Sequence, residues 1–331
     1  MKVILPVAGT GTRLRPFTLS LPKCLLPIAG KTLLDHIIDS YSSFAISEQI
    51  FITGYKGELV EKFLKDRQFG NVRTVVQSHP QGLGEAISLC LPFLTDDEPV
   101  LIILGDTLFE ADLSVLEYEK NNVLMTREVE DPRRFGVAVK DKSGVVTKLV
   151  EKPENFISNE ALVGIYYITD VAALRASLTR LIKENIRTRG EFQLTDALQM
   201  MLESGCIFHT SPIKSWLDCG TPETFLETNS LMLSRLDNSS FRSFPGSKII
   251  APCYIADSAV IKDSVVGPNV SIGPEVSVIK SKISDSVISE RVSLRNSKIS
   301  HSIFGEDSEV CCFKGSLLLG DHSRVDSEVA C

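Results

Sequence analysis

Short apolar runs alternate with amphipathic stretches over the first two thirds of the chain. The apolar runs lie at 3–7, 49–53, 72–76 and 100–104. Between them, apolar residues recur at helical spacing over 33–41, 59–64 and 85–94. Strands that alternate with helices predict βαβ units, and folds of this kind bind their ligands at the carboxyl ends of the strands.

More strand patterns follow in the second half of this region. They lie at 135–139, 145–150 and 163–168, and the residues at 141–144 between the first two have the composition of a hairpin turn. Leu174, Leu178 and Leu181 fit one face of another helix. We predict an α/β domain over residues 1–240, built on a Rossmann-like mixed sheet.

The apolar pattern changes at about residue 246 and then repeats every six positions. The residues that follow this spacing are Tyr254, Val260, Val266, Ile272 and Val278. Two adjacent copies, VGPNVS at 266–271 and IGPEVS at 272–277, agree at several positions. A six-residue repeat of this kind predicts a parallel β-helix, in which each side of a coil directs one apolar residue inward. The alternative is a β-rich tail without such coils.

The length of this tail limits the β-helix to a few coils. Coils of about 18 residues, three sides of six, give a short left-handed β-helix of roughly four or five coils over 246–331. So short a solenoid has an uncapped end that needs cover. We therefore expect the protein to form a homo-oligomer through this tail.

Composition excludes several classes of protein. The chain has 331 residues, of which 43% are hydrophobic and 23% charged, as in a globular protein rather than a disordered one. The net charge of −7 argues against nucleic-acid binding. No apolar stretch is long enough to span a membrane, and the run at 3–7 is too short for a signal peptide. The eight cysteines are scattered and show no zinc spacing. Together with the acidic charge and the lack of a signal peptide or membrane span, this leads us to expect a cytoplasmic protein without a membrane partner.

A glycine-containing loop, Gly9-Thr10-Gly11-Thr12-Arg13, follows the first predicted strand directly. Glycine lets the backbone approach an anion, its N–H groups can donate to phosphate oxygens, and Arg13 adds a cation with bidentate geometry. The loop lacks the Gly-Lys-Ser/Thr of a Walker A motif. Leu14 also stands where the dinucleotide-binding pattern has its third glycine. By itself, the loop fits an ordinary turn equally well.

The loop and the residues after it resemble the signature of the sugar-1-phosphate nucleotidylyltransferases. AGTGTR at 8–13 is similar to the AGxGTR motif of that family, and PKCLLP at 22–27 is similar to PKxLLP. Segments resembling later motifs of the family follow in order, at 77 with 82–86, 105–106, 135–137, 151–153, 164–166, 191–196 and 216–221. The last segment has Cys219 where the family has Thr. The resemblance covers nearly the whole chain, because longer members also carry a hexapeptide tail.

This resemblance implies a reaction and a set of cations that serve it. A phosphate oxygen of a sugar 1-phosphate attacks the α-phosphorus of a nucleoside triphosphate (NTP), and pyrophosphate leaves. The nucleophile is already an anion, so the site has to neutralise charge rather than supply a base. Asp106 and Asp218 are the implied ligands of Mg²⁺, which prefers carboxylate oxygens. Arg13 and Lys23 would hold the triphosphate, and Lys152 the sugar phosphate.

The remaining candidate residues would bind the substrates. Gly9, Gly11 and Thr12 belong to the phosphate loop. Gln77 and Gly82 would read a pyrimidine base. Glu151 would accept hydrogen bonds from sugar hydroxyls, and Lys214 is a second candidate for a phosphate cation. Gly136 and Gly164 would let the sugar lie against the backbone, unless they are only strand glycines at bulges.

Several readings of the function remain open from the sequence. The first is a transferase that uses dTTP or UTP with glucose 1-phosphate. Mannose-1-phosphate guanylyltransferases also carry a hexapeptide tail and are the nearest alternative. A bifunctional enzyme would add an acyltransferase on the β-helix, with His301 or His322 as its catalytic histidine. A non-catalytic regulatory subunit is the last alternative, although such subunits usually lose a metal or phosphate ligand.

Overall fold

The computed structural model describes residues 1–116, 119–238 and 241–327, and it divides the chain into two compact units. Unit 1 comprises Met1–Gly9 and Ile37–Trp216, and unit 2 comprises Thr10–His36 and Leu217–Cys331. The phosphate loop thus belongs, from Thr10 onward, to the same unit as the C-terminal tail. The domain limits expected at 1–240 and 246–331 stay a prediction, because compact units are not the same as domains that fold independently.

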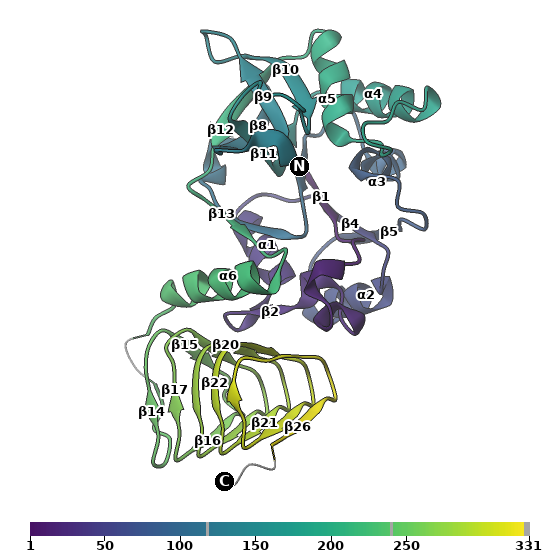
Figure 1. Cartoon of the computed structure of the whole chain (residues 1–331). Helices are drawn as coiled ribbons and strands as arrows, with labels where there is room; N and C mark the ends of the chain where they lie inside the picture. The colour runs from purple at the N-terminus through teal and green to yellow at the C-terminus, as the bar shows by residue number, and fades with distance from the viewer. Residues whose placement is uncertain (117–118, 239–240, 328–331) are drawn as a thin grey trace. The chain divides into compact units, whose positions relative to one another are not determined.

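A mixed sheet of nine strands forms the centre of unit 1 (Figure 1). Its strand order is β10-β9-β11-β6-β1-β4-β5, with β8 beside β11 and β12 beside β8. β6, β1, β4 and β5 are parallel, whereas β11 is antiparallel to β6, β8 and β9. The nine strands are β1 (Lys2–Pro6), β4 (Glu48–Thr53), β5 (Val72–Val76), β6 (Val100–Ile103), β8 (Asn122–Glu128), β9 (Gly136–Lys140), β10 (Val146–Glu151), β11 (Glu160–Ile168) and β12 (Phe208–Pro212). The predicted Rossmann-like mixed sheet is confirmed.

Helices cover this sheet with their apolar faces. Leu174, Leu178 and Leu181, which the sequence places on one helix face, are fully buried on α4 in the core beside the sheet. α3, α4 and α5 lie together in Figure 1. The helices with residues in unit 1 are α1 (Leu33–Tyr41), α2 (Gly57–Arg67), α3 (Leu83–Ser88), α4 (Val171–Lys183) and α5 (Leu194–Glu203). Two short strands, β7 (Thr107–Glu110) and β13 (Ser215–Asp218), lie outside the large sheet.

The helix expected over 85–94 is wrong in its extent. α3 ends at Ser88, and a separate 3₁₀ turn at Leu91–Phe93 follows it. Pro92 explains the break, because proline lacks an N–H and its ring clashes with the carbonyl four residues earlier, which is that of Ser88.

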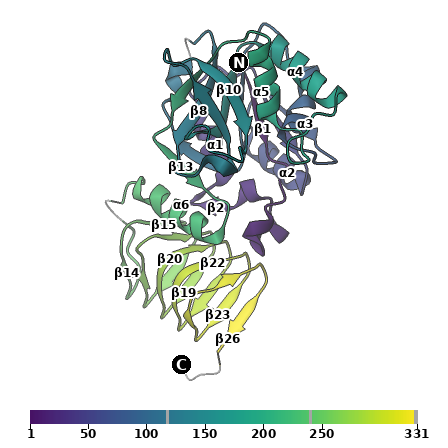
Figure 2. The ribbon, with the colours of Figure 1, turned by 45° about the horizontal axis from the view of Figure 1, so that its top comes forward.

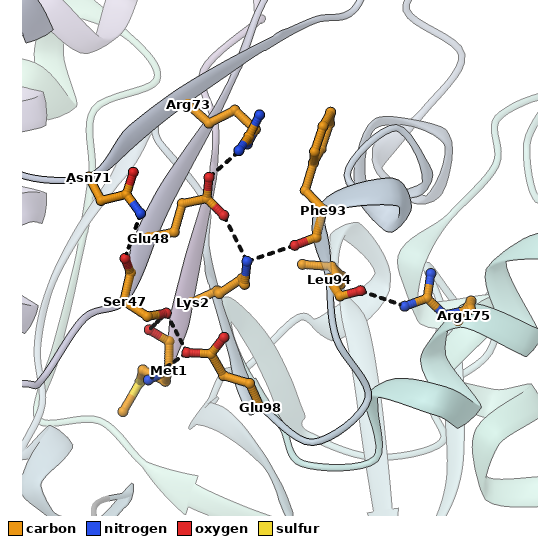
Figure 3. A network of polar contacts seen from close by, with 10 residues as sticks. All are labelled: Met1, Lys2, Ser47, Glu48, Asn71, Arg73, Phe93, Leu94, Glu98 and Arg175. Carbon is orange, nitrogen blue, oxygen red and sulfur yellow. Dashed lines mark hydrogen bonds and ion pairs between the residues drawn. The ribbon is translucent and has the colours of Figure 1, made fainter.

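A buried carboxylate ties together the amino ends of β1, β4 and β5 (Figure 3). Glu48 is 5% exposed and accepts hydrogen bonds from Lys2 Nζ and Arg73 Nε, both at 2.7 Å. Lys2 Nζ also donates to the carbonyl oxygen of Phe93 at 2.7 Å. Burial by itself raises the pKa of Glu48, but the hydrogen bonds from Lys2 and Arg73 outweigh it and hold this pKa below its usual range.

We predict that Glu48→Gln lowers the free energy of unfolding by about 3 kcal/mol at pH 7, because it leaves Lys2 without its anionic partner. A lowered carboxyl pKa contributes stability above its unfolded-state value and loses it as the pH falls through the folded-state value. The gap between wild type and variant should therefore close at acidic pH. Urea unfolding from pH 7 down to pH 3 measures it. Glu61→Gln on α2 is the matched control, and a gap that does not depend on pH would contradict the assignment.

The tail of unit 2 is a parallel β-helix with three sides (Figure 2). One side is the sheet β16-β19-β21-β23-β26. The other two sides form one sheet, because β20 and β22 each continue around a corner; β20 pairs with β17 by its first residues and with β18 by its last. The strands are β14 (Lys248–Ile249), β15 (Cys253–Ile255), β16 (Val260–Lys262), β17 (Val265–Val266), β18 (Val270–Ile272), β19 (Ser277–Ile279), β20 (Lys282–Ile288), β21 (Ser293–Arg295), β22 (Lys298–Phe304), β23 (Glu309–Cys311), β24 (Lys314–Gly315), β25 (Leu318–Leu319) and β26 (Arg324–Asp326). The predicted β-helix is confirmed.

The coils are shorter than the expected 18 residues. Ile261 pairs with Val278, 17 residues later, and Val278 pairs with Leu294 after 16. Val310 pairs with Val325 after only 15. These residues form one of the apolar stacks that fill the interior of the solenoid.

This difference corrects two of the residues expected to point inward. Extending an 18-residue coil back from Val278 gives Val260, whereas the 17-residue coil gives Ile261. Val260 is 58% exposed and Ile261 is 1% exposed. In the same way Ile255, not Tyr254, pairs with Ile272. The Tyr254 ring instead packs on Gly30, where an added Cβ would lie 2.3 Å from its Cε2 atom.

Residues 10–36 and α6 (Pro222–Ser234) pack with the β-helix in unit 2. The segment has three 3₁₀ turns, at Thr12–Leu14, Phe17–Leu19 and Lys23–Leu25, and a hairpin of β2 (Pro27–Ile28) and β3 (Lys31–Thr32). Asn229 of α6 is 1% exposed, and its Oδ1 accepts from the Ala29 N–H at 2.9 Å and from Ser271 Oγ at 2.7 Å. One amide oxygen thus joins the segment, the helix and the solenoid. Over the described ranges, we find no helix with the length and apolarity needed to cross a bilayer.

Candidate functional site

The strand order of unit 1 reverses direction beside β1. The chain proceeds from β1 to β4 and β5 on one side, and β6 then lies on the other side of β1. The Gly105 N–H after β6 donates to the Pro6 carbonyl oxygen of β1 at 3.2 Å, and a Cβ on Gly105 would lie 2.4 Å from Val7 Cγ1. Glycine is needed for this contact. Open α/β sheets bind their ligands at such a reversal, at the carboxyl ends of the strands.

Asp106 and Gly9 lie at this edge of the sheet. Asp106 follows Gly105 directly and is exposed, and its Oδ1 accepts from Thr107 Oγ1 at 3.2 Å. Gly9 is also exposed, three residues beyond the end of β1. Unit 1 thus presents one predicted metal ligand and the first glycine of the phosphate loop at neighbouring strand ends.

The rest of the phosphate loop folds within unit 2. Gly11 has a φ of 59°, and a Cβ there would lie 2.9 Å from Thr18 Cγ2 and 3.1 Å from Lys23 Cβ. Thr18 Oγ1 donates to the Gly11 carbonyl oxygen at 2.8 Å. The glycine is therefore required by its backbone angle and by close packing, and this packing brings the loop onto Lys23. Thr12 and Arg13 are exposed, and Lys23 is half-buried.

Arg13 and Asp218 lie together beside a second glycine of unit 2. A Cβ on Gly220 would lie 2.8 Å from Asp218 Oδ1 and 3.1 Å from Arg13 Nη2. Both side chains are exposed, and Asp218 is the last residue of β13. Residues that are 205 positions apart in the sequence, a predicted phosphate-binding cation and a predicted metal ligand, therefore share one small region.

In unit 1, the residues predicted for the sugar gather around Gly136. A Cβ there would lie 2.9 Å from both Glu151 Oε2 and Thr195 Oγ1. Thr195 Oγ1 donates to Glu151 Oε2 at 2.7 Å, and Lys152 Nζ lies 3.4 Å from Glu151 Oε1. Glu151 therefore has a fixed carboxylate with a cation beside it, and this carboxylate packs so closely on Gly136 that a side chain at position 136 would displace it.

The backbone holds Lys152 in an unusual conformation. Its φ is 44°, in the left-handed region that non-glycine residues rarely adopt. The Lys152 N–H donates to the Phe135 carbonyl oxygen at 2.9 Å, and its own carbonyl accepts from Arg189 Nη2 at 2.9 Å. Backbone strain of this kind persists where the surrounding structure enforces it.

Gln77 and Gly82 lie at the end of β5 and the start of α3. Gln77 is 7% exposed, and its Nε2 donates to Glu85 Oε2 at 2.6 Å. Gly82 has a φ of 120°, and a Cβ there would lie 2.4 Å from the Phe192 carbonyl oxygen. Close packing on Phe192 thus already accounts for the glycine.

Among the residues that the structure describes, the contacts of Gly164 and Lys214 involve none of the other candidate residues. Gly164 has a φ of 86° and lies where the pairing of β11 with β8 shifts register, between Leu162 and Tyr166. It sits in an irregular stretch of the strand, as its alternative reading expected. Lys214 is exposed, and its N–H donates to the Glu110 carbonyl oxygen at 2.8 Å.

Sequence reasoning assigned no role to Thr195, Arg189 or Glu85, although Thr195 and Glu85 lie within the motifs it used. The contact of Thr195 with Glu151 joins residues 44 positions apart. Asp196, next to Thr195, has a buried Oδ2 without a hydrogen-bond partner. Burial, followed by the charge of Glu151, raises the pKa of Asp196. Polar residues in the first turn of α5 were the available signal.

Comparison with known proteins establishes the family. The family model described as "Nucleotidyl transferase" matches residues 2–235, so this chain belongs to the nucleotidyl transferase family. A relative of Haloferax volcanii, "Low-salt glycan biosynthesis nucleotidyltransferase Agl11", is 34% identical over 70% of this chain. The alignment spans only 66% of that relative.

Two further relatives align with nearly the whole chain. "Glucose-1-phosphate thymidylyltransferase" of Streptomyces griseus is 29% identical over 98% of this chain and 99% of its own length. "Probable mannose-1-phosphate guanylyltransferase 3" of Oryza sativa is also 29% identical, over 99% of this chain and 93% of its own length. The solved structure of a putative glucose-1-phosphate thymidylyltransferase from Bacillus anthracis superposes with a TM-score of 0.59 at 26% identity, covering 73% of this chain and 98% of that one.

Proposed function

We propose that this protein joins a nucleoside triphosphate to a sugar 1-phosphate, forming a nucleotide sugar and pyrophosphate. The observation that carries the proposal is the placement of Arg13 and Asp218 beside Gly220. A triphosphate that binds with a divalent cation is held by positive side chains on its oxygens and by carboxylates on the cation, so both kinds of group are expected in one region. The names of the relatives support the same class of reaction.

The chemistry needs charge neutralisation and positioning. An oxygen of the sugar phosphate forms a bond to the α-phosphorus, and the bond from that phosphorus to the oxygen bridging the β-phosphorus breaks. Because the attacking oxygen already carries negative charge, no side chain has to remove a proton. Positive groups and N–H donors held in place lower the barrier for two anions that must meet.

We assign the residues of this chain to the two substrates as follows. Arg13 and Lys23, with the backbone of Gly9, Gly11 and Thr12, hold the triphosphate and the departing pyrophosphate. Lys152 binds the phosphate of the sugar, and Lys214 is an auxiliary cation for it. Glu151, oriented by Thr195, accepts hydrogen bonds from sugar hydroxyls, and Gly136 and Gly164 let the sugar lie against the backbone. Gln77 and Gly82 bind the base.

Asp106 and Asp218 fit a magnesium ion by their donor chemistry. Within residues 1–116, 119–238 and 241–327, no three or more His, Cys, Asp or Glu side chains come together as a metal site. Mg²⁺ commonly binds through one or two carboxylates and completes its shell with substrate phosphates and water. When bound, the ion would offset negative charge on the phosphates.

We propose dTTP or UTP as the nucleotide and glucose 1-phosphate as the sugar. Purified full-length protein with Mg²⁺, each of five NTPs and glucose, mannose or N-acetylglucosamine 1-phosphate, assayed for pyrophosphate, tests this. Highest activity with GTP and mannose 1-phosphate would favour the second candidate, which the rice relative supports at the same identity as the Streptomyces griseus relative supports the first. No pyrophosphate from any pair would leave the non-catalytic alternative.

The tail and the setting of the protein remain proposals too. We propose that the β-helix mediates a homo-oligomer and that the enzyme is cytoplasmic. An added acyltransferase would transfer acetyl from acetyl-CoA to an amino-sugar phosphate. His301 and His322, its candidate histidines, both lie on the solenoid at φ values of 47° and 55°.

We predict that Gly136→Ala raises KM for the sugar 1-phosphate about tenfold, with a smaller change in kcat. The added methyl group would displace the Glu151 carboxylate from Thr195, and this carboxylate is the group assigned to the sugar hydroxyls. Steady-state kinetics with each substrate varied in turn measures this. Gly70→Ala is the control, since a Cβ there meets nothing within 4 Å. An unchanged sugar KM would remove Gly136 from the sugar site.

A further inference from the structure

The side-chain amide of Gln77 is held in one orientation. Its Nε2 donates to Glu85 Oε2 at 2.6 Å and lies 3.5 Å from the Gly82 carbonyl oxygen. A carboxylate and a carbonyl both accept hydrogen bonds and donate none. The opposite orientation would bring the Gln77 oxygen against both acceptors with no proton between them. Glu85 and Gly82 together therefore keep the amide nitrogen of Gln77 turned toward themselves.

The same orientation leaves the amide oxygen as the group that Gln77 presents. In the part of the chain that the structure describes, no donor is found for Gln77 Oε1. Gln77 Oε1 is not one of the fully buried polar atoms that lack a hydrogen-bond partner. Because it has no partner among the described residues, it must therefore be accessible from the surface. The backbone supports the arrangement, because the Gln77 N–H donates to the Thr53 carbonyl oxygen at 2.8 Å. Gln77 thus offers an acceptor at a fixed place.

An acceptor at this place discriminates between two kinds of nucleobase. Uracil, thymine and guanine carry a protonated ring nitrogen beside a carbonyl group, which can donate to Gln77 Oε1. Cytosine and adenine carry an unprotonated ring nitrogen at the corresponding position, which would face the oxygen as a second acceptor. Their exocyclic amino group could donate to Gln77 Oε1 only if the base moved from the position that a keto base takes. A polar site that leaves its own group unpaired against the wrong ligand rejects that ligand strongly.

We propose that Glu85 is a positioning residue that sets the base specificity of this enzyme, restricting it to triphosphates of keto bases by fixing the amide of Gln77. This inference rests on the proposed function, because it takes Gln77 as the group that reads the base. It adds a residue for which the motif resemblance indicates no role. It does not distinguish uracil or thymine from guanine, because all three keto bases can donate to the same acceptor.

The test is Glu85→Gln, which keeps the size of the side chain and removes its acceptor-only character. A glutamine at position 85 can present either oxygen or nitrogen, so Gln77 becomes free to turn. We expect the ratio of kcat/KM for UTP over CTP, and for GTP over ATP, to fall at least about tenfold. Glu61→Gln on the exposed face of α2 is the matched control and should leave both ratios unchanged.

Two results would overturn the inference. One is an unchanged ratio in Glu85→Gln. The other is an equal loss with every NTP, because loosening of α3 lowers all activities together whereas an orienting role changes the ratio. Titration calorimetry of the five NTPs with the wild type and Glu85→Gln proteins separates this inference from the proposed function. Keto selectivity in binding that Glu85→Gln abolishes would uphold the role of Glu85 even without turnover, and wild-type binding without keto selectivity would refute it.

Discussion

Asp106→Asn and Asp218→Asn are each expected to lower kcat at least about a thousandfold, while the melting temperature stays within a few degrees of the wild type. Asparagine keeps the shape of the side chain but removes the charge that a hard divalent cation requires. Both side chains are exposed, so neither substitution leaves a buried group without its partner. A large loss of activity without a loss of stability is therefore the signature of the metal site.

Pyrophosphate release with saturating substrates, and thermal unfolding of the same samples, measure the two quantities. Asp97→Asn is the control, because Asp97 is also exposed but lies before β6 rather than after it. EDTA should abolish the activity of the wild type, and added Mg²⁺ should restore it. Full turnover in either aspartate variant would show that the assigned ligand is wrong.

The second large effect is expected in the solenoid. Phe304 is fully buried in the stack Ile272, Ile288, Phe304 and Leu319, which fills one side of the β-helix interior. Phe304→Ala removes most of a large side chain from between its neighbours, and the coils above and below limit how far the space can close. We expect a loss of about 3–5 kcal/mol in the free energy of unfolding.

Guanidinium unfolding followed by circular dichroism measures this loss. Val260→Ala, at the exposed position of the same solenoid, should change the free energy of unfolding by no more than about 0.5 kcal/mol. The pair of variants also tests the corrected register. If Val260→Ala were the costlier change, the inward-facing residues would follow the 18-residue coil after all.

The sequence predicts most of the α/β unit because its signals are local. Runs such as 100–104 are apolar enough to identify strands without any knowledge of their neighbours. The six-residue repeat likewise identifies the solenoid. Its coil length escapes prediction, because the two matching copies cover only 266–277, less than one coil. Lengths of 17, 16 and 15 residues emerge only when the strands are paired.

The site divides in the same way. The resemblance to the family's motifs singled out Glu151 and Gln77, but not the groups that orient them. Thr195 reaches Glu151 through the tertiary structure, and Glu85 reaches Gln77 across a loop and the first turn of α3. Hydrogen bonds of this kind leave no periodic trace in a sequence. Gly82 and Gly105 illustrate the converse, since their lack of a side chain is explained by close packing on Phe192 and Val7.

Through Asn229, the C-terminal tail supports the segment that carries Arg13 and Lys23. Its amide oxygen connects Ala29, which follows the turn bearing Lys23, to Ser271 inside the solenoid wall. Pro16 also lies against the late coil at Gly320, where a Cβ would be 3.0 Å away. A fragment trimmed after α6 would thus not be a minimal enzyme, because it would release the stretch that carries Arg13 and Lys23. Heat inactivation should accordingly follow melting of the solenoid, even while the Rossmann-like sheet is still intact.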